Sequence, residues 1–525
     1  MSLSKDFTIV GLATLLSRLT GFVRDILIAA VLGSGAVADA YIVAFLLPNF
    51  FRRVISEGAF NAAFVPIFAR RREESGAAGA QAFAEAALSS FVALILGLLL
   101  LVQFAMPVFI AALAPGFVAI PEKFDNAVLF SRIAFVFVGF VLLVALLSAV
   151  LNAINRFALV ALAPVILNVM LIGVLVALWI LGTGANYSSG LVLVVTVAVA
   201  GFVQLAYVWH ALSRSAFPLK LQQPSFGPDI RRLLLLALPG MAIAGSGHLN
   251  LLLASQLSTA LPSAVSWLYY ADRIFQLPLS FVSAAIGVVL LPEVARSLRA
   301  GDQASARTSN LRALEFGLLL VLPAAASLLI LAGPIVGIIY ERGMFLASDS
   351  MATAEVLRSL AFALPGFVLV AVLLPPYLAR ESFKVPLIAG LCGLVANVVV
   401  AVGLFSTKAH TAAPLGVAVS AWVNAAILFA GLGAVGHLRF DSLARRRLPA
   451  ILLSAGCTAA LVQVLSGYAA GWLEAPTPLA LRAGVLALIC CFGVVSHLLL
   501  ASITGAVDPG ALRSMFSRQK NSHET

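Results

Sequence analysis

The feature that most constrains this chain is a long hydrophobic stretch near its start, residues 7–32, that contains Arg18, Arg24 and Asp25. On insertion scales, one arginine at the centre of a bilayer costs about 2.5–3.5 kcal/mol. Charged side chains persist at that depth when they face a water-filled cavity or a charged partner. The stretch therefore predicts a polar chamber inside a membrane protein, and its arginines favour an anion as the occupant.

Composition excludes an ordinary soluble domain. Hydrophobic residues make up 62% and charged residues only 10% of the 525 residues, and the mean hydropathy is +1.07. Apolar runs that can cross about 30 Å of hydrocarbon recur along the chain, and we count about fourteen of them. We expect α-helices because unpaired backbone groups are costly in lipid. The predicted class is an all-α polytopic membrane protein, whose four cysteines are interpreted as small core residues and not as disulfides or metal ligands.

Positive charge alternates between the connectors of these spans. Residues 70–72, 231–232 and 445–447 are all arginine, whereas connectors 33–35, 182–190 and 258–263 carry no lysine or arginine. By the positive-inside rule, the basic connectors and both termini are cytoplasmic, which requires an even number of spans. The net charge of +11 then reflects topology and contact with anionic membrane lipids, and we expect no nucleic-acid partner.

A weak internal repeat divides the chain. Residues 65–70 resemble residues 291–296, and Leu47-Pro48 corresponds to Leu277-Pro278. Two six-helix halves that both enter from the cytoplasm imply parallel repeats, and transporters bind substrate between such halves. We therefore expect an N-terminal lobe over 1–215, a C-terminal lobe over 216–440, and two additional helices with a cytoplasmic tail over 441–525. The last two helices are either a structural appendage or a groove for a lipid tail.

Polar side chains gather at related places in the two halves. The candidates are Ser17, Arg18, Arg24, Asp25, Asp39, Asn49, Arg52 and Glu57 in the first half, and His248, Asn250, Asp272 and Arg273 in the second. Helical spacing puts Asp25 near the face of Arg18, with Arg24 turned partly away. A guanidinium suits phosphate because its planar fork donates two parallel hydrogen bonds, so such a cavity could hold a diphosphate. Plain ion pairs, Arg24 with Asp25 and Asp272 with Arg273, are the alternative.

Several short motifs follow one another in a fixed order. They are Ser17-Arg18-Leu19-Thr20-Gly21-Phe22-Val23-Arg24-Asp25, Leu47-Pro48-Asn49-Phe50-Phe51-Arg52-Arg53, Glu57-Gly58-Ala59-Phe60, Ser266-Trp267-Leu268-Tyr269-Tyr270-Ala271-Asp272-Arg273 and Gly343-Met344-Phe345. This series, spread over about residues 5–440, resembles the MurJ (MviN) lipid II flippases of the multidrug/oligosaccharidyl-lipid/polysaccharide exporter superfamily. The resemblance implies two six-helix lobes around a central cavity, with two extra C-terminal helices.

The resemblance also implies a function. Lipid II, an undecaprenyl-diphosphate-linked muropeptide, would move from the cytoplasmic to the outer leaflet of the bacterial inner membrane, with Arg18, Arg24, Arg52 and Arg273 holding the diphosphate. The other polar candidates would support binding or gating, and the protein would act as a monomer, alone or beside the cell-wall synthesis machinery. The chain departs from the family at Ala30, Leu46 and Ala371, where a basic residue is common. The eleventh span has Asn397 and no acid, which argues against sodium coupling.

Two alternatives remain open at this point. A flippase for another polyprenyl-diphosphate-linked oligosaccharide would use the same fold and the same basic cavity. An integral-membrane enzyme acting on polyprenyl diphosphate would need clustered acid–base groups or metal ligands, whereas the six histidines are scattered along the chain. We therefore expect a transporter and not an enzyme, without a cofactor or a metal.

Overall fold

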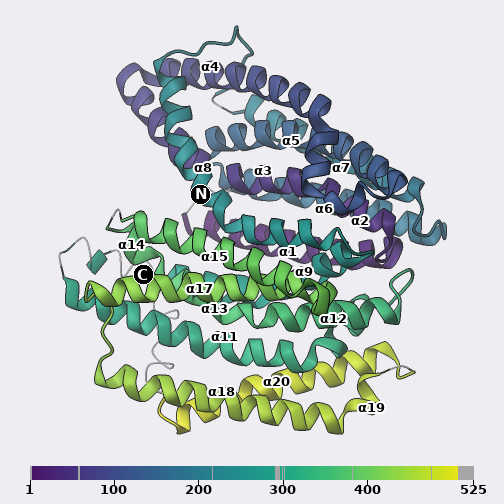
Figure 1. Cartoon of the computed structure of the whole chain (residues 1–525). Coiled ribbons are helices and arrows are strands. Elements are labelled where there is room, and N and C mark those ends of the chain that lie inside the picture. The colour runs from purple at the N-terminus through teal and green to yellow at the C-terminus, as the bar shows by residue number, and fades with distance from the viewer. Residues whose placement is uncertain are drawn as a thin grey trace. The chain divides into compact units, whose positions relative to one another are not determined.

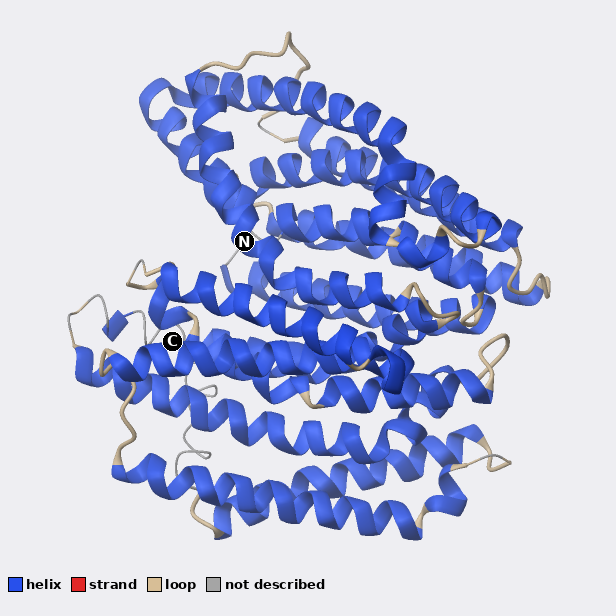
Figure 2. Cartoon of the chain, in the orientation of Figure 1, coloured by secondary structure: helices blue, strands red, loops and turns tan. Residues whose placement is uncertain are grey.

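The computed structural model is helical (Figures 1 and 2), and it describes residues 3–56, 59–215, 217–289, 296–297, 300, 302–380, 382–474 and 476–506. Within these ranges, the side chains of 3–8, 53–56, 59, 61–62, 238–248 and 288–289 are outside the description. Figure 2 shows helices and loops and no strand in the described part of the chain. The predicted all-α class is confirmed.

The chain forms two compact units. Unit 1, residues 1–269 with 342–346, contains α1 (Leu3–Leu32), α2 (Ala36–Ala44), α3 (Leu46–Ser56), α4 (Ala59–Leu113), η1 (Pro115–Phe117), α5 (Pro121–Ala153), α6 (Phe157–Ile180), α7 (Tyr187–Ser213), α8 (Pro228–Ser258) and the start of α9 (Ala264–Val289). Unit 2, residues 270–341 with 347–525, contains the rest of α9, α11 (Gln303–Tyr340), α12 (Ala347–Ala361), α13 (Ala363–Leu373), α14 (Pro375–Leu378), α15 (Lys384–Gly403), α16 (Phe405–Lys408), η2 (Ala409–Thr411), α17 (Ala412–Ala434), α18 (Ser442–Tyr468), α19 (Ala470–Leu473) and α20 (Leu479–Ile503). The helix α8 groups with unit 1 because it packs against α3 and α4.

Ten described helical segments are long and apolar enough to cross a membrane. The other four predicted spans fall on α1, on α2 with α3, on α8 and on α9. Charged residues interrupt two of them: Arg18, Arg24 and Asp25 in α1, and Asp272 and Arg273 in α9. A multi-pass membrane protein is therefore established, and the total of fourteen spans stays a prediction.

Two breaks shape the N-terminal helices. The helix α2 ends at Ala44, and α3 begins at Leu46, which places Pro48 in the first turn, where its missing N–H is tolerated. The long helix α4 contains a non-helical residue, Gly76, with φ of 68° and ψ of −166°. Glycine adopts a positive φ at little cost because it has no Cβ. We call the segment of α4 before Gly76 the α4 arm.

The α4 arm is held within unit 1 by aromatic packing and by ion pairs. Phe64, fully buried, stacks on Phe68 with ring centroids 5.9 Å apart and meets Phe83 at 5.3 Å. Arg71 Nε donates to Asp229 Oδ2 of α8 over 2.7 Å, and Arg70 Nη2 lies 3.1 Å from Asp229 Oδ1. These contacts fix the arm to the N-terminal end of α8.

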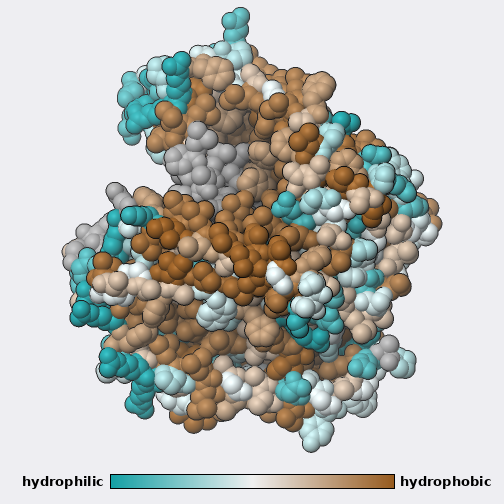
Figure 3. Space-filling model, viewed as in Figure 1, coloured by the Kyte–Doolittle hydropathy of each residue, from teal (hydrophilic) through white to brown (hydrophobic). Residues whose placement is uncertain are grey.

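The helix α15 shows how unit 2 meets lipid. Its outward stripe of Leu387, Leu391, Val395 and Val399 recurs every four residues and is more than half exposed, whereas its buried stripe of small and polar residues packs on α17. Small residues allow helices in a bilayer to approach closely. Figure 3 shows hydrophobic side chains over the middle of the unit 2 helices on this face and hydrophilic ones near their ends.

The four cysteines are free thiols, as the sequence predicts. Their interpretation as core residues is wrong for Cys392, Cys457 and Cys491, which are exposed, and Cys490 is half-buried. In a membrane protein an apolar surface residue can face acyl chains, so hydrophobic character did not distinguish the core from the lipid-facing surface.

Candidate functional site

Arg24 of α1 lies at the centre of a polar network in unit 1. Its Nε and Nη2 donate to Asp25 Oδ1 over 3.0 and 2.7 Å, and its Nη1 donates to Asn168 Oδ1 of α6 over 2.9 Å. The Asn168 amide returns to α1, donating to the Ser17 carbonyl over 3.0 Å and to Thr20 Oγ1 over 3.2 Å. Tyr269 Oη completes the group by donating to Asp25 Oδ1 over 3.0 Å. The network fixes the rotation of α1 against α6.

This geometry shows which arginine of α1 pairs with Asp25. Asp25 is 2% exposed and forms an ion pair with Arg24, its neighbour, and not with the exposed Arg18. Adjacent helical residues leave the helix in different directions, but the long Arg24 side chain reaches back to the carboxylate. An adjacent ion pair was one of the two alternatives that the sequence left open.

A second buried charge lies near the connectors that the sequence places outside. Asp39 of α2 is fully buried and pairs with Lys123 of α5, whose Nζ lies 2.6 Å from Oδ2. The backbone N–H groups of Ser263 and Ser266 donate to the carboxylate over 3.1 and 3.0 Å, and Ser266 Oγ donates over 2.5 Å. The Lys123 ammonium also lies 4.1 Å from the Phe117 ring centroid. We call Asp39, Lys123, Ser263 and Ser266 the Asp39 cage.

The same part of unit 1 holds a docked loop. Met344 N donates to the Ala30 carbonyl over 2.8 Å. Gly343 has φ of 59°, and a Cβ there would lie 2.3 Å from the Ala30 oxygen. Gly33 has φ of 62°, and its Cβ would lie 2.4 Å from the Met344 oxygen. Only glycine fits these two positions, which explains why the loop carries the Gly343 motif.

The remaining predicted residues are described less completely. Asn49 and Arg52 are half-buried on α3, and Asn250 is half-buried on α8. In unit 2, Asp272 is buried and accepts a hydrogen bond from Gln276, and Arg273 is half-buried. Glu57 lies outside the described residues, as does the side chain of His248, although its backbone is part of α8.

Sequence reasoning missed Asn168 and Lys123. Asn168 stands alone among apolar residues in α6, and an amide at such depth needs hydrogen-bond partners. Lys123 is a lysine in a predicted external connector, where positive charge is otherwise scarce. In both cases, the contrast between the residue and its neighbours in the sequence marks it as a candidate site residue. Ser266 and Tyr269 belong to the motif at residues 266–273, whose pattern predicts no role for these two side chains.

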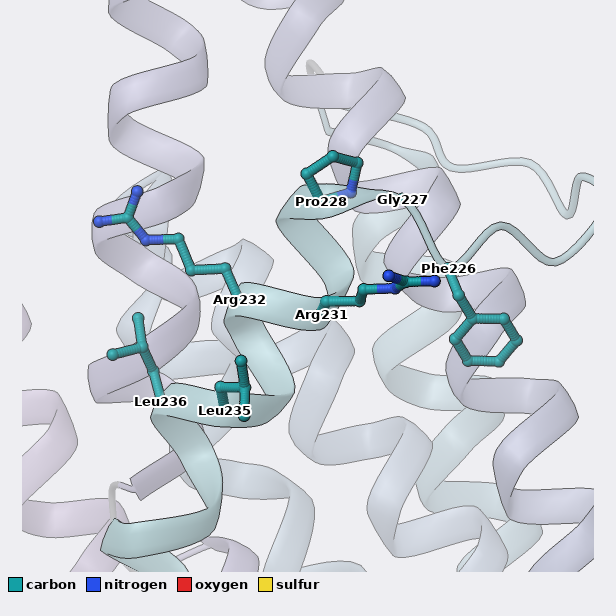
Figure 4. Close-up of a pocket in the computed structure, with 7 residues that line it drawn as sticks. All are labelled: Phe226, Gly227, Pro228, Arg231, Arg232, Leu235 and Leu236. Atoms are coloured by element: carbon teal, nitrogen blue, oxygen red, sulfur yellow. The ribbon is translucent and has the colours of Figure 1, made fainter.

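A cavity of about 780 Å³ opens at the start of α8 (Figure 4), lined by Phe226, Gly227, Pro228, Arg231, Arg232, Leu235 and Leu236. Figure 4 shows Arg231 extending toward Phe226, while Arg232 leaves the helix in a different direction. The two guanidiniums therefore do not converge on one point. Among the described residues, no group of three or more histidine, cysteine, aspartate or glutamate side chains could hold a metal ion.

The fold is shared with solved membrane transporters. An inward-facing multidrug resistance MATE family transporter of the MOP superfamily aligns over 80% of this chain and 94% of its own, with a TM-score of 0.65 and 15% identity. A structure of the lipid II flippase MurJ in an inward closed conformation aligns over 94% and 98%, with a TM-score of 0.77 and 21% identity. These matches define the fold class: a polytopic helical membrane protein that shares its fold with both solved structures.

Sequence comparison identifies the family. The family model described as lipid II flippase MurJ matches residues 28–475. A probable lipid II flippase MurJ of Rhizobium meliloti (strain 1021) is 39% identical over 519 residues, 99% of this chain and 97% of that protein. The lipid II flippase MurJ of Burkholderia cenocepacia is 31% identical over 82% of this chain and 84% of its own length. The chain belongs to the lipid II flippase MurJ family, as its motifs indicate.

Proposed function

We propose that this protein moves lipid II from the cytoplasmic to the outer leaflet of the bacterial inner membrane by alternating access, with both termini in the cytoplasm. The observation that carries the proposal is the family match over residues 28–475, together with the relative that is 39% identical over 99% of the chain. The process is translocation without covalent chemistry. The proposed moving parts are the lobes 1–215 and 216–440, with 441–525 as an appended pair of helices, in a protein that functions as a monomer.

The proposed ligands of the cargo diphosphate are Arg18, Arg24, Arg52 and Arg273. The contacts of Arg24 support its role, because Asp25 and Asn168 hold the guanidinium in a defined orientation. A guanidinium carries five N–H donors, enough to hold these partners and to donate to a phosphate as well. Preorganised donors lose less entropy when a ligand binds.

The remaining polar candidates have proposed supporting roles. Ser17 and Asp25 position Arg24 through the α1 network, since the Ser17 carbonyl holds the Asn168 amide. Asn49, Glu57, His248, Asn250 and Asp272 are proposed to provide polar lining for the sugar and peptide parts of the cargo.

We propose that the Asp39 cage is an external gate. It joins α2, α5 and the start of α9 through a buried carboxylate that accepts from Lys123, Ser263 and Ser266. Release of cargo to the outside would require these bonds to open and water to enter. Water would then solvate both charges, which offsets part of the lost attraction.

The test is complementation of a bacterium depleted of its own lipid II flippase, with outer-leaflet lipid II as the readout. Expression of this chain is expected to restore growth and the outer-leaflet pool. Failure of an inserted, well-expressed protein to restore that pool would refute the proposal. Restoration of another polyprenyl-diphosphate-linked oligosaccharide in its place would favour the alternative cargo.

A further inference from the structure

Three basic side chains from three separate segments influence one another at one end of unit 2. Arg307 lies near the start of α11, Arg380 follows α14, and His437 follows α17. The Arg307 charge acts on Arg380, and both arginines act on His437. Figure 1 shows α14, the start of α11 and the end of α17 at the left edge of unit 2. We call these three residues the basic cluster, and its connectors belong to the set that the charge pattern places in the cytoplasm.

Each member of the basic cluster has a buried nitrogen that lacks a hydrogen-bond partner. These atoms are Arg307 Nε, Arg380 Nε and His437 Nδ1. Buried polar atoms are nearly always satisfied in folded proteins, so each exception calls for an explanation such as a bound ion. Three such atoms on mutually interacting cationic or titratable side chains indicate a place for an acceptor that carries negative charge.

The neighbouring arginines Arg312 and Arg447 differ in that carboxylates pair with them, although Arg447 Nε is also a buried nitrogen without a hydrogen-bond partner. Arg312 pairs with Glu315 and with Asp441, and Arg447 Nη1 lies 3.4 Å from Glu315 Oε2. In contrast, the hydrogen bonds recorded for Arg380 go to neutral acceptors: the Pro376 carbonyl at 2.8 Å and Gln303 Oε1 at 3.0 Å. Within the described residues, no carboxylate forms an ion pair with the basic cluster. One acid adjoins it in sequence, Glu381, which lies outside those residues.

The directions of two pKa shifts agree with positive charges that no nearby carboxylate compensates. Burial, and then the charges of Arg380 and Arg307, lower the pKa of His437. Burial, and then Arg307, lower the pKa of Arg380. An anion held among the three side chains would oppose these shifts, because it favours the protonated form of each neighbour.

We propose that the basic cluster is a binding site for a phosphate group on the cytoplasmic side of unit 2, separate from the proposed cargo site. Arginine forks and an imidazole N–H are suitable donors for phosphate oxygens. The phosphate would belong either to the headgroup of an anionic phospholipid of the cytoplasmic leaflet or to free inorganic phosphate. The inference goes beyond the proposed transport function and does not depend on the identity of the cargo.

The first experiment uses the full chain in detergent and inorganic phosphate as the probe. Thermal unfolding is followed over a phosphate titration at constant ionic strength, because a ligand that binds only the folded state raises the unfolding temperature. The second uses nanodiscs of phosphatidylcholine with or without phosphatidylglycerol. Stabilisation by free phosphate identifies the soluble ligand, and stabilisation by phosphatidylglycerol alone identifies the lipid headgroup.

The variants decide whether either response comes from this site. The double variant Arg307→Gln with Arg380→Gln is expected to lose at least tenfold in apparent affinity for the probe that stabilises the wild type. The matched control is Arg445→Gln, which replaces an exposed arginine near the start of α18 and is expected to keep the wild-type response. If the double variant does not fold, His437→Gln is used, with an expected loss of several-fold. A wild-type protein that responds to neither probe, or variants that respond like the wild type, would overturn the inference.

Discussion

Replacement of Asp39 by asparagine tests the most deeply buried charge among the described side chains. Asp39 is fully buried and Lys123 is 5% exposed, so Asp39→Asn leaves an ammonium group in the interior without its carboxylate. Breaking a buried ion pair from one side costs about 3–5 kcal/mol. Lys123→Met leaves the carboxylate with its donors from Ser263 and Ser266. The expected loss is then about 1.5–3 kcal/mol, the value of one charge-assisted hydrogen bond.

The double variant separates pairing from general damage. Because the charges are removed together, its loss of unfolding free energy should be smaller than the sum of the two single losses by at least about 1 kcal/mol. The measurement is equilibrium unfolding in mixed detergent, with Lys408→Met, an exposed lysine, as a control expected within about 0.5 kcal/mol of the wild type. Additive losses would refute the argument that Asp39 and Lys123 stabilise each other directly.

Four further outcomes follow from the structure and the proposals. Arg24→Ala and Arg273→Ala should each sharply reduce outer-leaflet lipid II with insertion intact, and lysine should rescue only partly; normal complementation by both alanine variants would remove the site assignment. Gly343→Ala should destabilise more than Gly182→Ala, since both have positive φ but only Gly343 meets backbone within 3 Å, and equal unfolding temperatures would contradict this. Because the pKa of His437 is lowered in the folded protein, the unfolded chain binds a proton at this histidine at a higher pH than the folded chain does. The free energy of unfolding should therefore decrease as the pH drops below about 6.5, and thermal scans of His437→Gln should show a smaller decrease. Collapse of the membrane potential should stop transport, since moving a charge is worth about 2.3 kcal/mol per 100 mV, while sodium removal should not; the opposite result in vesicles would mean sodium coupling.

The fold class was accessible from sequence because hydropathy acts locally. The apolar runs predicted the helices, and the break at Phe45 between α2 and α3 leaves Pro48 in the first turn of α3. Two of the four uncounted spans show the limit of this approach. The same charges that suggest a polar chamber in α1 and α9 remove these two helices from a count by length and hydropathy. Polar residues that serve function therefore lower the hydropathy by which the same helix would be recognised as a membrane span.

The contacts of the candidate site could not be predicted in the same way. Cβ directions placed Asp25 near Arg18, but the reach of Arg24 and the presence of Asn168 from a helix far along the chain decided the actual pair. Which amide meets which guanidinium depends on how α1 and α6 pack, and no spacing rule within one helix contains that information. The Asp39 cage likewise joins residues from three segments.

The break at Gly76 determines how the α4 arm can move relative to the rest of α4. An unbroken helix of 55 residues would be about 80 Å long, far beyond the hydrocarbon thickness of about 30 Å, and would tilt as one rod. With a residue of positive φ between them, the arm and the span can change direction separately. Since Arg70 and Arg71 attach the arm to Asp229, a displacement of the first turn of α8 is expected to turn the arm about Gly76. The part of α4 that follows Gly76 would then stay in place while the α4 arm changes its direction.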